Sequence, residues 1–600
     1  MRRFSATLIA GAAAFLTVLA TIVAAPSATA AAAGAPLTVC PGFSGYNNTN
    51  SYTAVESGYV SILGHTTKLV SSSGATAWTA NPYKNVSWQT WFHSLKWLGD
   101  LIYTASGRHS GLTTAQRQNA LNFAVKVVAD YRAKNPGALT TKPTLWQKNS
   151  SGHRAQVLGC LLESLGGNAP SWLVSYANTE AAWLTSSKNY LGAWNQGLDQ
   201  DLGAIAITCV TGYRLVRDSV VRRASATMDT NIDSDGATSE QSVGYGAYGY
   251  ALWTKVITSM DACGITPPSV AARVRLVPDF LAWGSTPNGH LEQLGDTTYD
   301  PSPNIASTSA QYAATLGALG TPPAGRTRIY NNAGYVFGRS SWSSLTSSMY
   351  YSLRFGPKMA LHGHADKTSV TYWVRGQQIL TDSGHIGYND TKARIYLRST
   401  AAHNTVSTPA RTYLREGHGS AALVGQWQSG NADGYTVADY SLGLQIGSTW
   451  KYYAKTRSVV VLRNPDVMIV LDKVAGGAKG QAWNQRWHFA PGVKRVSGSS
   501  TRATFSNGAS ILSVPVATSP AAKTTVASSW IARTTGVKTA DLQAVVTTSG
   551  RHAQFLTVVA PSGSIGYRYD AAAGQLTVTN YGQTVAVLQI NANGSLTQVG

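Results

Sequence analysis

Apolar residues along the chain follow two different spacings. Between about residues 88 and 283 they recur three and four positions apart, for example over residues 91–103 and 198–215, which is the spacing of amphipathic helices. Beyond about residue 329 the pattern changes to short alternating runs rich in Val, Tyr, Thr and Ser, such as residues 458–471. This alternation predicts antiparallel strands, so we expect a helical half followed by a β half.

Turn-rich segments suggest where the domains begin and end. A chain of 600 residues is too long for one core, so two or three domains are expected in an α+β multidomain fold. We expect a helical domain of antiparallel hairpins over residues 34–328 and a central antiparallel β-sandwich over residues 329–495. A Ser/Gly-rich patch at residues 496–500 predicts the start of a smaller C-terminal β domain, residues 496–600.

The first 33 residues are typical of a cleaved secretory signal peptide. Arg2 and Arg3 precede an apolar run over residues 6–25, and the small triplet Ala28-Thr29-Ala30 follows it. No later stretch is apolar enough to span a bilayer. We therefore expect a secreted, extracellular protein with no membrane attachment after signal cleavage.

The four cysteines are candidates for disulfides because an exported chain meets an oxidising compartment. Cys40, Cys160, Cys209 and Cys263 all lie in the first half, and their spacing matches no metal knuckle. One or two bridges are expected there, with three pairings possible and buried free thiols as the alternative.

The charge balance indicates the class of partner. The chain has 48 Lys+Arg against 27 Asp+Glu, a net charge of +21, which favours polyanions over neutral ligands. Nucleic acid is disfavoured because the chain has no long basic runs or nucleic-acid motif and is predicted to be exported. An acidic polysaccharide is the expected partner, with a purely solubilising charge as the alternative. No pattern in the sequence indicates the oligomeric state.

Three potential zinc ligands come from separate segments of the β half. His364, Asp382 and His403 supply imidazole nitrogen and carboxylate oxygen, which zinc accepts. His362 precedes His364 by two positions, so on a strand both side chains would face the same side. The alternative is that these polar residues make only local hydrogen bonds in β-turns.

The runs HGHADK (residues 362–367), LTDSGHIGY (380–388) and RSTAAHNTV (398–406) resemble the signature of the heparinase II/III-like polysaccharide lyases. This resemblance implies an N-terminal (α/α) toroid, in the form of an incomplete barrel, followed by antiparallel β-sandwich domains. It also implies a mainly structural zinc ion held by His364, Asp382 and His403. The implied activity is β-elimination in a uronate-containing acidic polysaccharide, which leaves an unsaturated uronate at the new non-reducing end.

Elimination from a uronate needs a group that neutralises the carboxylate, a base for the C5 proton and an acid for the leaving O4. Residues 235–248 are similar to the family segment in which a glutamate precedes the catalytic tyrosine by about one helical turn. We assign Tyr245 as the proton shuttle and Glu240 as a positioning residue, with Tyr248 as a competitor on nearly the same helical face. The alternative is that this Tyr/Gly-rich string only packs a helix.

Two further catalytic assignments rest on the resemblance. Asn195 falls where the family holds the uronate carboxylate, and an amide suits that task. Gln196 stands where the family usually carries a histidine, which puts any mechanism through that histidine in doubt. His362 becomes the second catalytic candidate because the resemblance places the first histidine of the HGH run toward the cleft.

Several residues between the zinc-ligand segments are candidates for substrate binding. A guanidinium can pair bidentately with a carboxylate, and Arg398 is favoured over Arg394 because it lies inside the RSTAAHNTV run. Tyr388 and Tyr396 accompany the arginines, and His488 is a weaker candidate from a neighbouring strand. Ordinary surface salt bridges are the alternative for the arginines.

Two other functions compete with a lyase. A glycoside hydrolase would need two carboxylates that flank the scissile bond, and Asp199, Asp201, Asp235 and Glu240 are the clustered acids. A non-catalytic glycan-binding protein is the second alternative, suggested by Gln196. An unsaturated, ultraviolet-absorbing product would distinguish the lyase from both.

Overall fold

The computed structural model describes residues 40, 49–105, 111–135, 143–388, 390–409, 417–441, 443–446, 449–516 and 522–600. The predicted signal peptide lies outside these residues. The chain forms two units, of which the first contains Met1–Ile232 and Tyr248–Arg275 and the second contains Asp233–Ala247 and Leu276–Gly600. Each unit is described by itself below.

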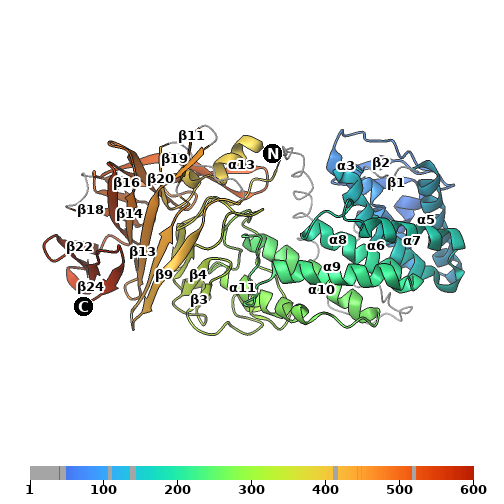
Figure 1. Ribbon diagram of the computed structural model, residues 1–600, viewed down its shortest axis with the longest axis horizontal. Coiled ribbons are helices and arrows are strands. Elements are labelled where there is room, and N and C mark those ends of the chain that lie inside the picture. Colours follow the sequence, from blue (N-terminus) through green and yellow to red (C-terminus); the bar gives the residue numbers. More distant parts are fainter. Residues whose placement is uncertain are drawn as a thin grey trace. The chain divides into compact units, whose positions relative to one another are not determined.

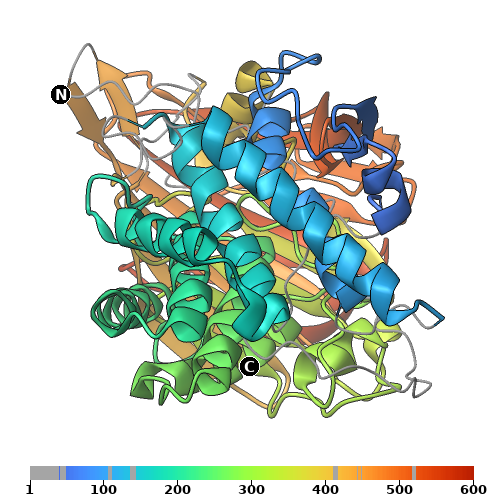
Figure 2. The same ribbon diagram turned by 90° about the vertical axis from the view of Figure 1, so that its right-hand side faces the viewer.

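The first unit consists almost entirely of helices (Figures 1 and 2). Helix α6 packs against α3, α7 and α8, and α8 also packs against α9, so consecutive helices form the expected hairpins. The elements are α2 (Tyr52–Glu56), β1 (Tyr59–Ile62), β2 (His65–Lys68), α3 (Val86–His93), α4 (Gly99–Ala105), α5 (Thr114–Lys134), α6 (Leu145–Leu165), α7 (Ser171–Thr185), α8 (Asn195–Thr211), α9 (Arg214–Asn231) and the larger part of α10 (Val243–Ala262).

Two of the expected helices are each interrupted by a left-handed residue. The pattern over residues 91–103 predicts one helix, but Leu95 has φ 59° and separates α3 from α4. The pattern over residues 198–215 also predicts one helix, but Gly212 has φ 71° and ends α8 before α9 begins. The apolar spacing continues across both breaks, which is why it does not reveal them.

Glycines allow α6 and α8 to cross at close range. A Cβ on Gly203 would lie 2.5 Å from the carbonyl oxygen of Gly152, and a Cβ on Gly159 would lie 2.7 Å from the Cβ of Ala206. These distances are shorter than any normal contact, so the two backbones approach more closely than side chains would permit. This crossing fixes the position of α8, the helix that begins with Asn195.

Two disulfides join segments of the first unit. Cys40 is bonded to Cys160, and Cys209 at the end of α8 is bonded to Cys263 just beyond α10. The expectation of bridges in the first half is confirmed, and the pairing that the sequence left open is settled. No helix among the described residues is long and apolar enough to cross a bilayer.

The second unit is built mainly of antiparallel sheets (Figure 1). The five-stranded sheet contains β3 (Thr327–Tyr330), β4 (Tyr335–Arg339), β5 (Tyr350–Arg354), β6 (Val370–Val374) and β7 (Gln377–Leu380). The eight-stranded sheet has the order β16 (Arg495–Gly498), β17 (Arg502–Phe505), β18 (Ser510–Val514), β21 (His552–Ala560), β14 (Val467–Ala475), β13 (Ala454–Leu462), β10 (Ala432–Asp439) and β9 (Ala421–Gln428).

Smaller sheets and three helices complete this unit. One four-stranded sheet has the order β19 (Lys523–Thr534), β20 (Val537–Ser549), β15 (Ala482–His488) and β8 (Val406–Ser407), and the other contains β22 (Ile565–Asp570), β23 (Gln575–Asn580), β24 (Gln583–Ile590) and β25 (Leu596–Gln598). The remaining elements are α11 (Val277–Trp283), α12 (Ser309–Ala314), α13 (Thr391–Leu397) and the hairpin of β11 (Gly443–Ile446) and β12 (Thr449–Tyr452).

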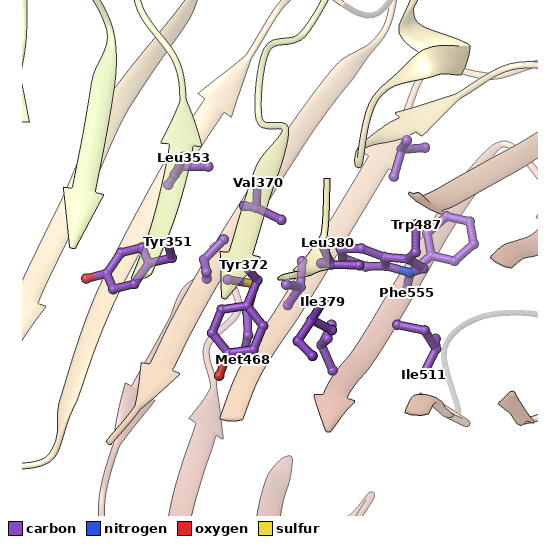
Figure 3. Close-up of a cluster of buried hydrophobic side chains, with 14 of the residues drawn as sticks. Tyr351, Leu353, Val370, Tyr372, Ile379, Leu380, Met468, Trp487, Ile511 and Phe555 are labelled. Carbon is purple, nitrogen blue, oxygen red and sulfur yellow. The ribbon is translucent and has the colours of Figure 1, made fainter. Parts of the chain in front are cut away.

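The central strands of the eight-stranded sheet are buried on both faces. Along β14, Met468 and Val470 point into the core shared with the five-stranded sheet, whereas Ile469 and Leu471 point into the core under β22–β25. Figure 3 shows the first of these cores, with Met468 beside Tyr372 of the five-stranded sheet. A strand buried on both faces needs a continuous apolar run instead of an alternating one, and residues 467–471 supply it.

The expected domain boundary at residue 496 does not separate two sheets. The Ser/Gly-rich patch at residues 496–500 belongs to the end of β16 and the turn into β17, and both strands lie in the eight-stranded sheet. Among the described residues, only the sheet of β22–β25 is made entirely of strands that follow residue 496. The patch forms a hairpin turn and not a linker between domains. Composition does not distinguish the two, because the same residue types occur in both.

Candidate functional site

The carboxylate of Asp296 lies at the centre of a buried cluster of polar side chains in the second unit. Its Oδ1 lies 3.1 Å from Nε2 of His364 and 3.0 Å from Nδ1 of His385. Its Oδ2 lies 3.1 Å from Nδ1 of His362 and accepts from Nη2 of Arg394 at 2.5 Å. Because an ionised carboxylate only accepts hydrogen bonds, all four partners act as donors.

A glycine brings Asp296 into this position. Gly295 has φ 63°, and a Cβ there would lie 2.3 Å from the carbonyl oxygen of Gln241 and 2.7 Å from that of His362. The backbone N–H of Asp296 donates to the carbonyl of His362 at 2.8 Å, and the side chain of Gln241 donates to the carbonyl of Lys358 at 2.7 Å. The loop after α11 is thereby tied to the loop after β5.

Tyr245, His362 and Tyr388 form a continuous hydrogen-bonded and stacked group. The rings of Tyr245 and His362 are stacked, with centroids 3.4 Å apart and planes 8° from parallel. The hydroxyl of Tyr388 lies 2.6 Å from the hydroxyl of Tyr245 and 3.2 Å from Nδ1 of His362. The Arg394 guanidinium lies 4.7 Å from the centroid of the Tyr388 ring. Three groups that can exchange protons are therefore in contact.

Glu240 is adjacent to the free edge of the His362 ring. Its Oε2 lies 3.6 Å from Nε2 of His362, while the other ring nitrogen is engaged by Asp296 and Tyr388. The side chain of His362 is 15% exposed and that of Glu240 is 6% exposed. His362 is thus the more accessible of the two.

Burial and charge fix the protonation of these groups at neutral pH. Burial opposes ionisation of Asp296, but Arg394 and His385 outweigh it and hold the pKa of this carboxyl well below its usual value. Burial lowers the pKa of His362 to about 4 despite Asp296, raises that of Glu240 to about 8, and raises that of the Tyr245 phenol. At pH 7 the cluster therefore contains an ionised aspartate, a neutral imidazole, a protonated glutamate and a protonated phenol.

The three predicted zinc ligands are neighbours in the same unit. Nδ1 of His403 lies 2.6 Å from Oδ1 of Asp382, and the rings of His403 and His364 have centroids 5.3 Å apart. All three side chains are fully buried, and Nε2 of His403 has no hydrogen-bond partner. In donor type, burial and proximity they fit a zinc ion.

The donor atoms do not converge on one point. Both ring nitrogens of His364 are hydrogen-bonded, Nε2 to Asp296 and Nδ1 to Ser383 at 3.2 Å. Within the described part of the chain, no group of three His, Cys, Asp or Glu side chains is arranged to hold a metal ion. Zinc at these residues therefore stays a prediction.

The predicted arginine and the weaker candidates have other contacts. The guanidinium of Arg398 donates to the carbonyl oxygens of Gly363 at 3.0 Å and Leu361 at 3.2 Å, so it supports the HGHADK loop. His488 is fully buried, and its Nδ1 lies 3.0 Å from Asp541. Tyr396 lies on α13, where its hydroxyl is 2.7 Å from that of Ser529. The burial of His488 and its contact with Asp541 indicate a structural role instead of substrate binding.

Asn195, Gln196 and Tyr248 belong to the helical unit. Asn195 is the first residue of α8, and its Oδ1 accepts from the backbone N–H of Gln196 at 2.7 Å. Both side chains are half-buried, as is Tyr248 on α10. Tyr245, three residues earlier on that helix, is the tyrosine that contacts His362. The roles predicted for Asn195 and Gln196 stay predictions.

Two members of the cluster, Asp296 and His385, are not among the predicted site residues. Asp296 follows Gly295 in a loop with no motif, and only its position in the fold reveals its role. His385 lies inside the LTDSGHIGY run, between the selected residues Asp382 and Tyr388, so the run contained a signal for it. The motif favours Arg398 over Arg394, yet Arg394 is the arginine that binds Asp296.

Comparison with known proteins identifies the β half. The family described as heparinase II/III-like, C-terminal, matches residues 325–575. This segment contains the cluster residues from His362 to Arg394. Residues 325–575 are therefore similar to the C-terminal domain of this family. No curated protein matches the chain in sequence.

Solved structures show that the likeness extends over most of the chain. The heparan sulfate lyase HepC from Pedobacter heparinus has a TM-score of 0.69 at 17% identity, with 94% of this chain and 90% of that chain covered. Heparinase III has a TM-score of 0.67 at 18% identity, with coverage of 88% and 86%. The Streptomyces coelicolor A3 chondroitin AC lyase has a TM-score of 0.51 at 12% identity, with coverage of 85% and 84%. The predicted fold class, a helical toroid followed by antiparallel β-sandwich domains, is confirmed.

The buried Glu240 predicts a pH-dependent stability. Between its ordinary pKa of 4.5 and its folded pKa of about 8, the folded protein keeps a proton that the unfolded chain releases. The free energy of unfolding therefore falls as the pH rises through this window. Glu240→Gln cannot ionise, so we expect it to gain roughly 1–4 kcal/mol relative to wild type between about pH 5 and pH 8, measured by urea unfolding.

Asp235→Asn is the matched control, because this carboxylate is 39% exposed and pairs with Arg328 at the surface. We expect its difference from wild type to stay constant over the same pH range. Parallel pH profiles for wild type and Glu240→Gln would contradict a buried, protonated Glu240.

Proposed function

We propose that the protein is a polysaccharide lyase that cleaves a uronate-containing acidic polysaccharide by β-elimination. The observation that carries the proposal is the contact of Tyr245, His362 and Tyr388 in one buried, hydrogen-bonded group. Elimination requires both removal and delivery of a proton, and this group supplies a base and an acid side by side.

In the proposed reaction His362 removes the C5 proton and Tyr245 protonates the leaving O4. The neutral imidazole can accept a proton at Nε2, since Asp296 and Tyr388 engage its Nδ1. The ionised Asp296 would stabilise the imidazolium that forms. Tyr388 bridges Nδ1 of His362 and the Tyr245 hydroxyl. After Tyr245 has given its proton to O4, the His362 imidazolium can release its Nδ1 proton to Tyr388 while Tyr388 passes its own proton to Tyr245, which leaves His362 neutral with the C5 proton on Nε2.

The charge of the cluster suits an anionic substrate. Arg394 balances Asp296, the histidines flanking Asp296 are donors to it, and protonation leaves Glu240 without charge. Structurally similar proteins include enzymes named for heparan sulfate and for chondroitin, both of which are acidic polysaccharides. Asn195 is our candidate for the group that binds the uronate carboxylate.

Export is part of the proposal. The N-terminal pattern of residues 1–33 is that of a secretory signal, and the bonds Cys40–Cys160 and Cys209–Cys263 are typical of proteins folded in an oxidising compartment. An extracellular location would also bring the protein to a polymer that cannot enter a cell.

Replacement of the proposed acid tests the reaction. We expect Tyr245→Phe to lower the rate of formation of the ultraviolet-absorbing unsaturated product by at least a hundredfold, because the phenol hydroxyl that protonates O4 is lost. Hyaluronan, chondroitin, heparan sulfate, alginate and glucuronan are the substrates to screen with the mature protein.

Tyr250→Phe on the same helix is a matched control, and we expect it to retain wild-type activity. New reducing ends without ultraviolet absorbance would contradict elimination and indicate a hydrolase. Binding that Tyr245→Phe leaves unchanged, with no turnover by wild type, would indicate a glycan-binding protein.

We also propose that His364, Asp382 and His403 hold a structural zinc ion. Their burial, their donor types and the unpartnered Nε2 of His403 support it. Bound zinc would cross-link the segments that contain the three residues. No step of the proposed reaction depends on it.

Metal analysis tests the zinc proposal. We expect about one zinc per chain by elemental analysis, and a melting temperature that chelation lowers by several degrees. Asp382→Asn is expected to lose the zinc. Asp541→Asn disrupts a similar buried pair, that of Asp541 with His488, and this variant should retain the zinc. Protein purified without chelator that contains no metal and does not respond to added zinc would contradict the proposal.

A further inference from the structure

A pair of aromatic rings lies on the surface of the second unit, outside the Asp296 cluster. Tyr396 of α13 and Trp530 of β19 have ring centroids 4.9 Å apart at 43°, and both side chains are half-buried. The hydroxyl of Tyr396 lies 2.7 Å from that of Ser529, which helps to fix its ring. The rings rest on a small apolar core of Ile386, Ala393, Leu397 and Ala532. Their inner parts are therefore held in place while part of each ring stays exposed.

Cationic side chains flank the aromatic pair. Nζ of Lys538 lies 5.0 Å from the centroid of the Trp530 ring, and the side chain is 52% exposed. Lys392, on the first turn of α13, is exposed as well. Asp390 is the acidic neighbour and lies 3.2 Å from Lys538. Partly exposed aromatic rings beside lysines are a combination that suits a sugar ring with an anionic substituent.

The same segments that carry the aromatic pair support the Asp296 cluster. On α13, Arg394 binds Asp296, whereas Tyr396 contacts Trp530. The strand that carries Trp530 continues to Ala532, whose carbonyl accepts from the backbone N–H of His385 at 3.1 Å. The aromatic pair is therefore continuous with the cluster through two short pieces of backbone.

We propose that Tyr396, Trp530, Lys392 and Lys538 form a second binding surface for the acidic polysaccharide, which holds sugar residues some distance along the chain from the cleaved bond. This surface rests on the proposed function for the identity of its occupant. The net charge of +21 and the two exposed lysines favour a polyanion, and the half-exposed rings favour a sugar over a peptide segment of opposite charge. The surface gives affinity for long chains without taking part in the chemistry.

Binding of immobilised heparan sulfate chains tests the surface directly. The measurements use Tyr245→Phe as the parent, so that cleavage does not remove the ligand. We expect Trp530→Ala to weaken binding roughly threefold to tenfold, since the stacking face is lost, and Trp530→Phe to retain most of it. Lys538→Gln should weaken binding at low salt and have less effect at high salt.

Matched controls are an exposed aromatic and an exposed lysine elsewhere in the same unit. Tyr581→Ala removes a ring that is 83% exposed, and Lys494→Gln removes one positive charge. Both should bind as the parent does. Binding that Trp530→Ala leaves unchanged would overturn the surface, as would a loss caused equally by Lys494→Gln and Lys538→Gln, which indicates general charge attraction. A parent that does not bind heparan sulfate would overturn it too.

A second readout separates this inference from the proposed function. In the wild-type background, Trp530→Ala should reduce product formation from long chains but not from a tetrasaccharide. Lyase activity together with binding that does not depend on Trp530 would overturn only the surface. Binding that depends on Trp530 in a protein with no lyase activity would overturn only the proposed reaction.

Discussion

The hydrogen bonds of one ionised carboxylate determine how the candidate site is assembled. Asp296 is almost fully buried, and a buried charge is tolerated only when it is paired and fully hydrogen-bonded. Arg394 supplies the opposite charge, and His362, His364 and His385 supply the remaining donors. The loop of Asp296, the HGHADK run, His385 and Arg394 must therefore come together, because burial of the Asp296 charge without these partners would be strongly unfavourable in free energy.

The same bonds give the cluster its chemical character. With Nδ1 of His362 directed to Asp296, the other ring nitrogen is left as the basic edge of a neutral imidazole. Tyr245 is held against that ring by stacking, and Tyr388 connects the two through its hydroxyl. Burial keeps Glu240 protonated, so it adds no negative charge beside the proposed base. The proposed base, the proposed acid and the uncharged Glu240 thus depend together on the hydrogen bonds of Asp296, on ring stacking and on burial.

Much of the fold and part of the site could be predicted from the sequence. Periodicity located the helical and β halves, and the HGHADK, LTDSGHIGY and RSTAAHNTV runs led to His362 and Tyr388. Sequence patterns do not predict residues whose role or conformation depends on contacts in three dimensions. Asp296 lies in a loop without a pattern, and the breaks at Leu95 and Gly212 are backbone conformations that apolar spacing does not register. The Ser/Gly-rich patch at residues 496–500 predicts a domain boundary but forms a hairpin turn, because turns within a sheet and boundaries between domains use the same residue types.

The central claim is that burial keeps His362 a neutral imidazole and that Asp296 fixes its proton on Nδ1. Nitrogen NMR of protein with ¹⁵N-labelled histidine reports this directly, because the two ring nitrogens have different shifts in each tautomer and in the cation. The His362 signal is assigned by its loss in His362→Gln. The account predicts a neutral ring at pH 7 with the proton on Nδ1, and a change in tautomer in Asp296→Asn, whose ring stays neutral. A cationic ring at pH 7, or a proton on Nε2 in the wild-type protein, would contradict it.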